Sequence, residues 1–502
     1  MDAKADICLI VEGAYPYVTG GVSSWVHDLI LAQAPLTFHL VALNADDKPR
    51  PPRFELPANV VGMTEIALQQ SECHIPAGYA AARLVQELER PLRNLLLRGG
   101  RDDFGRVLDA VRRHARVASR AELLNSELAF AMLQRMYKRS VPESSFLQYF
   151  WSWRALVGGL FSVLLARLPD ARVYHAISTG YAGLMMARAV LETGRAGLLT
   201  EHGIYTNERR IEIAMAEWLT DRSAPSLDIE KRRRNLRDVW LDAFIGYSRT
   251  CYECSSRIIT LYRGNQLMQE RDGALADRLV LIPNGVDVDF YGAIPRDTRP
   301  RRPTIGLIGR VVPIKDVKTY VRAVALLREL VPQVRALMLG PIDEDPIYFR
   351  ECADMVAYLG LGNSFEFCGR VQLRDYLGQI DVVVLTSLSE AQPLVLLEAG
   401  AAGVPSVATN VGSCRDIIEG CAYESPPLGP GGFVTPLANP RATAQALAEL
   451  LLDPALRSRC AEAIRQRTRR YYSKHVVDAT YRALYEGCLA VADRAAAPVG
   501  GM

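Results

Sequence analysis

Two glutamates, Glu390 and Glu398, are the side chains in this sequence whose type and spacing best suit ligand binding. They lie on either side of Pro393, a residue that often begins a helix. The apolar run 382–385 before them predicts a buried strand, and 404–409 after them predicts another. A strand–helix–strand unit binds ligands at the carboxyl ends of its strands, so both carboxylates are expected at a binding crevice.

The start of the predicted helix indicates an anion-binding site between the two carboxylates. The first N–H groups of a helix, here near Leu394 and Val395, have no partner within the helix and favour a negative charge. Carboxylates on either side of such amides suit a sugar joined through a diphosphate to a ribose. We therefore predict a nucleotide-sugar site. Either glutamate alone is equally explained by a favourable charge near a helix start.

Two cations stand at the end of a second predicted strand. Arg310 follows the apolar segment 304–309, and Lys315 precedes a helix whose apolar residues recur at helical spacing. A guanidinium grips phosphate oxygens in a fork, and an ammonium adds a compact charge. Together they would stabilise a departing diphosphate without a metal ion. Solvated surface cations remain the alternative interpretation.

These motifs resemble the donor-site signatures of retaining glycosyltransferase family 4. The resemblance rests on G-R-x4-K at 309–315, E-x7-E at 390–398, Pro-Asn-Gly-Val-Asp at 283–287 and Gly-Gly-Val at 20–22. It extends over nearly the whole chain and is strongest toward soluble transferases of exopolysaccharide synthesis, through the strings 11–30 and 198–210. One departure stands at Ser413, which follows Gly412 where family members often carry a second glycine.

The resemblance implies a fold and an activity. The expected fold is GT-B, an α/β architecture of two Rossmann-like domains, each with a doubly wound parallel sheet, facing a cleft. The expected activity is transfer of a hexose or N-acetylhexosamine from a UDP-sugar to a growing exopolysaccharide, with retention of configuration and no metal or other cofactor. Expected partners are the UDP-sugar, the polysaccharide acceptor, and synthase and export proteins of the inner membrane.

The resemblance also assigns roles to individual residues. His202, at a strand end, and Glu390 are expected to act on the transferred sugar, although a lone histidine there is commonly structural. The expected donor-binding residues are Arg310, Lys315, Leu394, Val395, Glu398, Gly20 and Gly21. Glu398 is expected to accept the ribose hydroxyls, and the two glycines let backbone approach the ligand closely. Segment 365–371, including Arg370 and Val371, is expected to recognise uracil through main-chain groups.

A length of 502 residues suggests two domains. We expect an N-terminal, acceptor-side domain over 1–294 with a largely helical insert at about 77–168, and a donor domain over 304–470. The proline- and arginine-rich segment 295–303 is the expected linker. A C-terminal helix within 471–502 is expected to cross back to the first domain.

Composition excludes several other classes of protein. A net charge of +3 gives no strong field for nucleic acid. No signal peptide is expected, and the apolar stretch 155–166 is too short to span a bilayer, so it predicts a core helix. We expect a cytoplasmic protein recruited by partners to the inner membrane. The D-x-D strings at 287–289 and 343–345 are not expected to bind metal.

Two rival functions remain open at this point. A UDP-sugar epimerase of the same architecture would bind the donor but need no acceptor. A non-catalytic scaffold subunit of a membrane polysaccharide synthase would keep its surfaces without needing the donor-site residues. Neither the transferred sugar (glucose, N-acetylglucosamine or N-acetylgalactosamine) nor the acceptor and linkage follow from the sequence.

Overall fold

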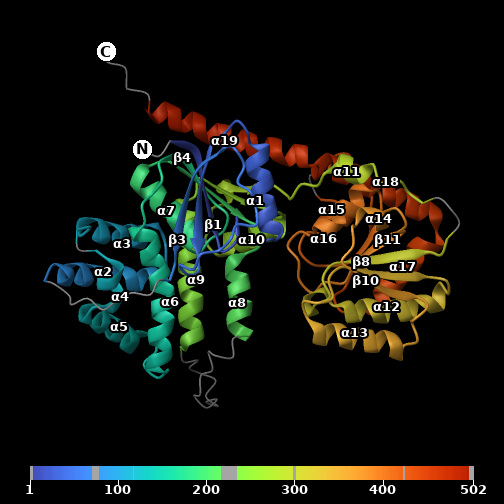
Figure 1. Cartoon of the computed structure of the whole chain (residues 1–502), viewed down its shortest axis with the longest axis horizontal. Helices are drawn as coiled ribbons and strands as arrows, with labels where there is room; N and C mark the ends of the chain where they lie inside the picture. Colours follow the sequence, from blue (N-terminus) through green and yellow to red (C-terminus); the bar gives the residue numbers. More distant parts are fainter. Residues whose placement is uncertain are drawn as a thin grey trace. The chain divides into compact units, whose positions relative to one another are not determined.

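The computed structural model describes residues 4–69, 79–116, 118–215, 234–297, 301–421 and 424–496. They fall into two compact units (Figure 1). Unit 1 comprises Met1–Thr260, Asn265–Leu281 and Tyr481–Met502, and unit 2 comprises Leu261–Gly264 and Ile282–Thr480.

Unit 1 contains a parallel sheet of seven strands in the order β3-β2-β1-β4-β5-β6-β7. Most of its strands are near-continuous apolar runs, as expected of a parallel sheet covered on both faces. The edge strand β3 was not predicted, because its residues alternate little and are mostly half-exposed. The strands are β1 (Ala5–Glu12), β2 (Phe38–Asn44), β3 (Val60–Ala67), β4 (Ala171–Ala176), β5 (Ala196–Glu201), β6 (Arg257–Thr260) and β7 (Leu279–Leu281).

The described residues of the predicted insert are largely helical, with breaks at Gly99–Gly100 and near Pro142. Its helices are α2 (Tyr79–Leu97), α3 (Arg101–Arg113), α4 (Arg120–Asn125), α5 (Glu127–Ser140) and α6 (Phe146–Leu165). The other helices of this part of the chain are α1 (Gly21–Ala32), α7 (Tyr181–Thr193), α8 (Tyr205–Met215), α9 (Leu236–Cys254) and α10 (Arg263–Arg271).

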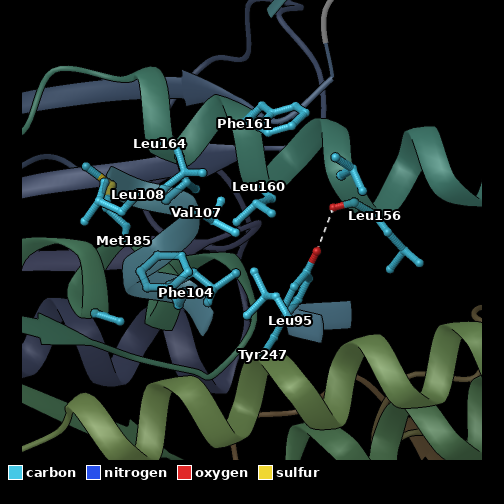
Figure 2. Close-up of a cluster of buried hydrophobic side chains, with 14 of the residues drawn as sticks. Leu95, Phe104, Val107, Leu108, Leu156, Leu160, Phe161, Leu164, Met185 and Tyr247 are labelled. Atoms are coloured by element: carbon cyan, nitrogen blue, oxygen red, sulfur yellow. Dashed lines mark hydrogen bonds between the residues drawn. The ribbon is translucent and has the colours of Figure 1, made fainter. Parts of the chain in front are cut away.

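Helix α6 is a core helix, as predicted for its apolar stretch. Its Leu156, Leu160 and Phe161 pack with Phe104 of α3 in a continuous buried cluster (Figure 2). The hydroxyl of Tyr247, on α9, donates to the carbonyl oxygen of Leu156 at 3.2 Å and ties the two helices together. Among the described residues, no helix is long and apolar enough to cross a membrane.

Unit 2 contains a parallel sheet of six strands in the order β10-β9-β8-β11-β12-β13. This is the order of a doubly wound Rossmann sheet, whose switch point, and hence whose ligand crevice, lies between β8 and β11. The short, half-buried β13 was not predicted. The strands are β8 (Thr304–Ile308), β9 (Arg335–Leu339), β10 (Phe365–Gly369), β11 (Val382–Leu385), β12 (Ser406–Thr409) and β13 (Gly432–Thr435).

Alternate residues of the central strand β11 face two different cores. Val382 and Val384 belong to the core that contains α12, whereas Val383 and Leu385 belong to the core that contains α15. The apolar run therefore reflects burial on both faces. The helices are α11 (Val288–Gly292), α12 (Val317–Leu330), α13 (Pro346–Tyr358), α14 (Arg374–Leu377), α15 (Leu394–Ala401), α16 (Cys414–Ile418), α17 (Pro440–Leu452) and α18 (Pro454–Tyr471).

The structure divides the chain earlier than residue 294. The segment from Ile282 joins unit 2, because the Val286 N–H donates to Tyr472 O at 2.8 Å and the Lys474 N–H donates back to Val286 O at 2.9 Å. Helix α19 (Lys474–Ala496) begins in unit 2 and belongs to unit 1 from Tyr481 onward.

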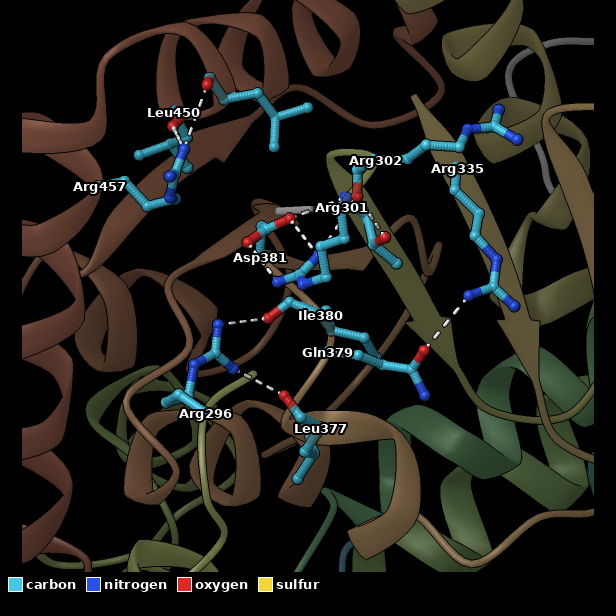
Figure 3. A network of polar contacts seen from close by, with 12 residues as sticks. Arg296, Arg301, Arg302, Arg335, Leu377, Gln379, Ile380, Asp381, Leu450 and Arg457 are labelled. Carbon is cyan, nitrogen blue, oxygen red and sulfur yellow. Dashed lines mark hydrogen bonds and ion pairs between the residues drawn. The ribbon is translucent and has the colours of Figure 1, made fainter. Parts of the chain in front are cut away.

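The described residues of the expected linker 295–303 are bound to unit 2 rather than free; residues 298–300 lie outside the described part of the chain. The Arg296 guanidinium donates to the carbonyl oxygens of Leu377 and Ile380, both at 2.6 Å. Arg301 forms a two-pronged ion pair with Asp381 at 2.7 and 2.9 Å (Figure 3). These arginines satisfy carbonyl and carboxylate groups at the start of β11, which the composition of the segment did not reveal.

Candidate functional site

Lys315 and Glu390 lie side by side at the switch point of unit 2. The Lys315 Nζ is 2.5 Å from Glu390 Oε1, and the two side chains are 19% and 16% exposed. Lys315 ends a short turn after β8, and Glu390 lies on the loop after β11. The hydroxyl of Thr386 stabilises this arrangement by a single hydrogen bond shared between Lys315 O at 2.9 Å and Asp316 O at 3.0 Å. The two strands thus hold an ammonium and a carboxylate together.

Arg310 does not join that pair in the structure. Its guanidinium donates to Glu344 at 2.9 Å, and its side chain is 53% exposed. Arg310 follows β8, and Glu344 follows β9, so both lie at the carboxyl edge of the sheet. The arginine therefore lies at the same edge of the sheet as Lys315 but in a more solvated position.

Helix α15 presents uncapped amides, as predicted. Its first residue is Leu394, and no side chain caps it. Pro393 directly precedes the helix, with an extended ψ of 110°, so the helix begins at Leu394 as predicted. Leu394 is exposed and Val395 is partly buried. Their N–H groups begin the helix and so carry its partial positive charge.

Glu398 lies further along α15, where it is largely removed from solvent. Its Oε1 accepts a hydrogen bond of 2.9 Å from the hydroxyl of Tyr291 on α11. Burial raises the pKa of the Glu398 carboxyl, and the hydrogen bond from Tyr291 opposes that rise. A carboxylate with one oxygen bonded in this way keeps its second oxygen available to accept a ligand hydroxyl.

The loop after β12 packs against the loop that carries Glu390. Gly412 has a φ of +52°, and a Cβ there would lie 2.3 Å from Glu390 O and 2.2 Å from Ala391 O. The Ser413 N–H donates to Ala391 O at 2.9 Å. Only a glycine permits this approach, so Gly412 positions the loop that carries Glu390.

Gln392 is a buried polar residue of the same loop that the motif analysis missed. Its Oε1 accepts a 2.6 Å hydrogen bond from the backbone N–H of Asn284. The contact joins the E-x7-E motif to the Pro-Asn-Gly-Val-Asp motif, which lies far earlier in the sequence. The only sequence signal for Gln392 is its place inside the E-x7-E motif, two residues after Glu390.

His202 of unit 1 directly follows β5. Its ring packs edge-on against Trp25 of α1, with ring centroids 4.5 Å apart. Both ring nitrogens are buried and have no hydrogen-bond partner among the described residues. Burial lowers the pKa of His202 to about 4, so the ring is neutral near pH 7. Trp25 was not predicted as a neighbour, because nothing local in the sequence links α1 to β5.

Glu201, next to His202, faces the opposite way, as strand geometry predicts. Its carboxylate is buried and accepts hydrogen bonds from Thr179, Tyr252 and Gln269. Burial raises the pKa of Glu201 to about 6, partly offset by these bonds. The Glu201 carboxylate is thus bonded within the interior of unit 1.

Gly20 and Gly21 lie at the start of α1, which no side chain caps. Both are exposed, and apart from adjoining backbone no atom of the described residues lies within 4 Å of the position that a Cβ would occupy at either residue. Gly20 is extended, with a φ of 175°. The backbone is therefore open to close approach, as expected.

Arg370 and Val371 follow the edge strand β10 of unit 2. Arg370 is highly exposed, and its guanidinium is 3.4 Å from Asp343. Val371 is partly buried. The structure places both at the carboxyl edge of the sheet, where main-chain groups of this segment can meet a ligand.

The two D-x-D strings have structural roles in unit 2. Asp287 caps α11 by accepting from the Phe290 N–H at 2.9 Å, and Asp345 caps α13 by accepting from the Tyr348 N–H at 3.0 Å. Within the described parts of the chain, no three His, Cys, Asp or Glu side chains gather as a metal site.

Comparisons with protein families match both units. Residues 5–277 match the model described as "Domain of unknown function (DUF3492)", and residues 302–453 match "Glycosyl transferases group 1". A D-inositol 3-phosphate glycosyltransferase of Kineococcus radiotolerans is 32% identical over 205 residues, which cover 37% of this chain and 46% of that protein. The chain thus spans about half the length of the curated relatives that it matches.

Solved structures match nearly the whole chain. Sucrose-phosphate synthase from Thermosynechococcus elongatus aligns with a TM-score of 0.57 at 16% identity, covering 97% of this chain and 100% of that one. Anabaena HepE in complex with UDP aligns with a TM-score of 0.56 at 14% identity, covering 96% and 99%. At such identities the likeness concerns the fold, which is GT-B, with two Rossmann-like parallel-sheet domains as the sequence predicted.

Proposed function

The chain belongs to the family of the domain of unknown function DUF3492 and carries a glycosyl transferases group 1 domain, and on that premise we propose that it is a retaining glycosyltransferase. Its donor is a UDP-sugar, and it transfers a hexose or N-acetylhexosamine to a growing exopolysaccharide. The strings 11–30 and 198–210 resemble PelF, so the proposed product is a Pel-type polymer.

The observation that carries the proposal is the Lys315–Glu390 pair beside the uncapped start of α15 at a Rossmann switch point. A diphosphate suits the ammonium of Lys315 and the amides of Leu394 and Val395. A sugar hydroxyl suits the carboxylate of Glu390. One ligand that carries both groups would satisfy every partner at once, which a simple anion would not.

The charge that develops on the leaving UDP is stabilised by Lys315, the α15 amides and Arg310. Glu398 accepts the ribose hydroxyls through the oxygen that Tyr291 leaves available. No metal ion is required in this proposal, because these groups supply the positive charge. Main-chain groups of 365–371, including Arg370 and Val371, recognise uracil.

The proposed role of His202 is to contact the reacting face of the transferred sugar. Its ring is neutral and its two nitrogens lack protein partners among the described residues, so it is equipped to bond uncharged hydroxyls. Gly20 and Gly21 lie in the same unit and offer open backbone to the diphosphate or the acceptor. The acceptor attacks from the face that UDP leaves, as in the transferases that the sequence resembles.

The proposed location is the cytoplasmic face of the inner membrane, reached through the Pel synthase and export proteins. Recovery of the protein with membranes only when those proteins are co-expressed supports this part of the proposal. Partition of the isolated protein into lipid vesicles contradicts it.

The activity is tested by incubating the protein with UDP-, GDP- and ADP-sugars, with and without oligosaccharide acceptors. We expect release of UDP that rises severalfold with acceptor and a glycosylated product with retained anomeric configuration. Conversion of the UDP-sugar without acceptor identifies an epimerase instead. Binding of no nucleotide-sugar in a thermal-shift panel favours the scaffold function.

A further inference from the structure

The side-chain amide of Gln392 is held in one orientation. Gln392 is 7% exposed, and its Oε1 accepts from the Asn284 N–H at 2.6 Å. A backbone N–H is only a donor, so the amide oxygen must be the atom that faces it. The Nε2 amide group is thereby fixed on the other side, away from Asn284.

The Nε2 group lacks a partner of its own. It is buried and makes no hydrogen bond to any residue that the structure describes. A buried donor left in this state costs about 1–3 kcal/mol relative to one that is bonded. The hydroxyl of Ser413, on the loop that supports Ala391, is likewise buried without a partner in the described chain. Gln392 Nε2 and Ser413 Oγ are therefore two buried polar groups of this region that a ligand could bond.

We propose that Gln392 is a specificity-determining residue of the donor site and that its Nε2 donates a hydrogen bond to a hydroxyl oxygen of the transferred sugar. The inference rests on the proposed function. Gln392 lies between Glu390 and the start of α15 along one short loop, so its amide belongs to the region where the sugar meets the diphosphate.

The chemistry favours a hydroxyl over a phosphate oxygen. A sugar hydroxyl is both donor and acceptor. It can therefore donate a hydrogen bond to a carboxylate such as Glu390 while its oxygen accepts one from an amide N–H. The diphosphate already has Lys315 and the α15 amides as charged or dipolar partners. An uncharged donor beside a carboxylate is suited to fixing one hydroxyl and hence one sugar configuration.

The position of Asn284 explains why the amide is so precisely oriented. Its backbone lies in the Pro-Asn-Gly-Val-Asp segment, which pairs with the chain around Tyr472 and Lys474 through Val286. Gln392 is thus bonded to a second part of unit 2. A flip of its side-chain amide, which would exchange Oε1 and Nε2, would leave the Asn284 N–H without an acceptor.

The decisive variant is Gln392→Glu, which keeps an acceptor for the Asn284 N–H and removes only the donor. The probes are UDP and whichever of UDP-glucose, UDP-N-acetylglucosamine and UDP-N-acetylgalactosamine binds the wild-type protein most tightly. We expect the Kd of the UDP-sugar to rise about tenfold or more, with a similar fall in kcat/KM, because a bonded sugar oxygen loses its partner. The Kd of UDP should change less than about twofold.

Two further variants separate this effect from charge and from folding. Gln392→Met removes the donor without adding charge and should show the same sugar-specific loss. Gln379→Glu makes the same charge change at a residue bound to Arg335 and the Asp375 carbonyl, and should leave both affinities unchanged. The melting temperature without ligand shows whether each variant is folded.

Each other outcome contradicts the inference. An equal loss of UDP and UDP-sugar affinity in Gln392→Glu assigns the amide to the diphosphate. Unchanged affinities in Gln392→Glu contradict the proposed hydrogen bond. A loss of UDP-sugar affinity in Gln392→Glu but not in folded Gln392→Met contradicts it as well, because the added charge alone would then explain the loss. If the wild-type protein binds UDP but no UDP-sugar, the proposed function fails first and independently of Gln392.

Discussion

The ammonium of Lys315 and the carboxylate of Glu390 lie 2.5 Å apart, so the two opposite charges of the candidate site neutralise each other. Both are mostly shielded from solvent, which strengthens their attraction. In the proposed function, a diphosphate competes with Glu390 for Lys315 and a sugar hydroxyl binds the released carboxylate. We therefore expect the complete nucleotide-sugar to bind more tightly than either half, because it compensates both partners.

Lys315→Ala should lower turnover about a hundredfold, because it removes positive charge where the leaving group becomes anionic, a loss of roughly 3 kcal/mol. Arg310→Ala should act in the same direction. The measurement is kcat with saturating donor. Lys318→Ala is the matched control and should retain full activity, since Lys318 of α12 pairs with Glu351 of α13. Less than a threefold loss in both site variants, with the fold intact, would exclude them from catalysis.

Gly412→Ala should lower kcat/KM by more than its loss of unfolding free energy can explain. A Cβ at Gly412 meets Glu390 O and Ala391 O at 2.3 and 2.2 Å and must displace the loop that holds Glu390. Gly360→Ala is the matched control, because its φ of +63° imposes comparable strain while nothing lies within 4 Å. Gly360→Ala should lose about 1 kcal/mol of unfolding free energy from the φ strain alone, Gly412→Ala should lose more because of the added clash, and only Gly412→Ala should lose most of its kcat/KM. Equal activity in the two variants would contradict the supporting role of Gly412.

His202→Ala should abolish transfer while leaving the Kd of UDP nearly unchanged. The physical reason is that the groups proposed to bind the nucleotide belong to unit 2, whereas His202 belongs to unit 1 and is proposed to contact the sugar. Isothermal titration with UDP and a radiolabelled transfer assay measure the two effects. A parallel loss of UDP binding would make His202 a donor anchor. Full activity would make it structural.

UDP should stabilise the protein without magnesium. At a hundredfold excess over its Kd, a ligand that binds only the folded state adds about 2.7 kcal/mol of stability. Melting temperatures with UDP should therefore rise equally in EDTA and in magnesium. A rise that appears only with Mg²⁺ or Mn²⁺ would refute the metal-free proposal.

His175 should make unit 1 less stable in mild acid. Its ring is fully buried, bonded to the hydroxyls of Tyr485 at 2.7 Å and Thr200 at 2.9 Å, and faces Tyr481 and His202. Burial, aided by His202, lowers the pKa of His175 from 6.5 to about 3. As the pH falls below 6.5, the unfolded state takes up a proton that the folded state does not. Stability is therefore lost between pH 6.5 and 3, by about 2 kcal/mol at pH 5.

The test compares urea unfolding of the wild-type protein and His175→Gln at pH 7.5 and 5.0. Glu201 acts in the opposite direction, because its pKa is raised to about 6 and the folded state protonates first. The effect of His175 is therefore measured by the free energy of unfolding of the wild-type protein minus that of His175→Gln. This difference should be smaller by about 2 kcal/mol at pH 5.0 than at pH 7.5. A pH-independent difference would mean that His175 has the same pKa in the folded and unfolded states, and a difference that grows in acid would mean that its folded-state pKa is raised.

The sequence by itself determined the class of fold and most of its elements. Apolar runs such as 382–385 are buried on both faces of a parallel sheet, so their composition alone marks them as strands. The strands that escaped prediction, β3 and β13, are edge strands, where half-exposed residues leave no continuous apolar run. The start of α15 at Leu394, directly after Pro393, also followed from the sequence, because proline disfavours helical backbone in the residue before it and is favoured at helix starts.

Only the tertiary structure decided which side chains meet. Lys315 binds Glu390, 75 residues away, and the Asn284 backbone orients Gln392, 108 residues away. Trp25 packs on His202, and the segment from Ile282 joins unit 2 through its bonds to Tyr472 and Lys474. These contacts depend on strand order, on the register of neighbouring strands and on loop packing. Local spacing contains none of that information, because residues far apart in sequence are brought together only when the sheet is assembled.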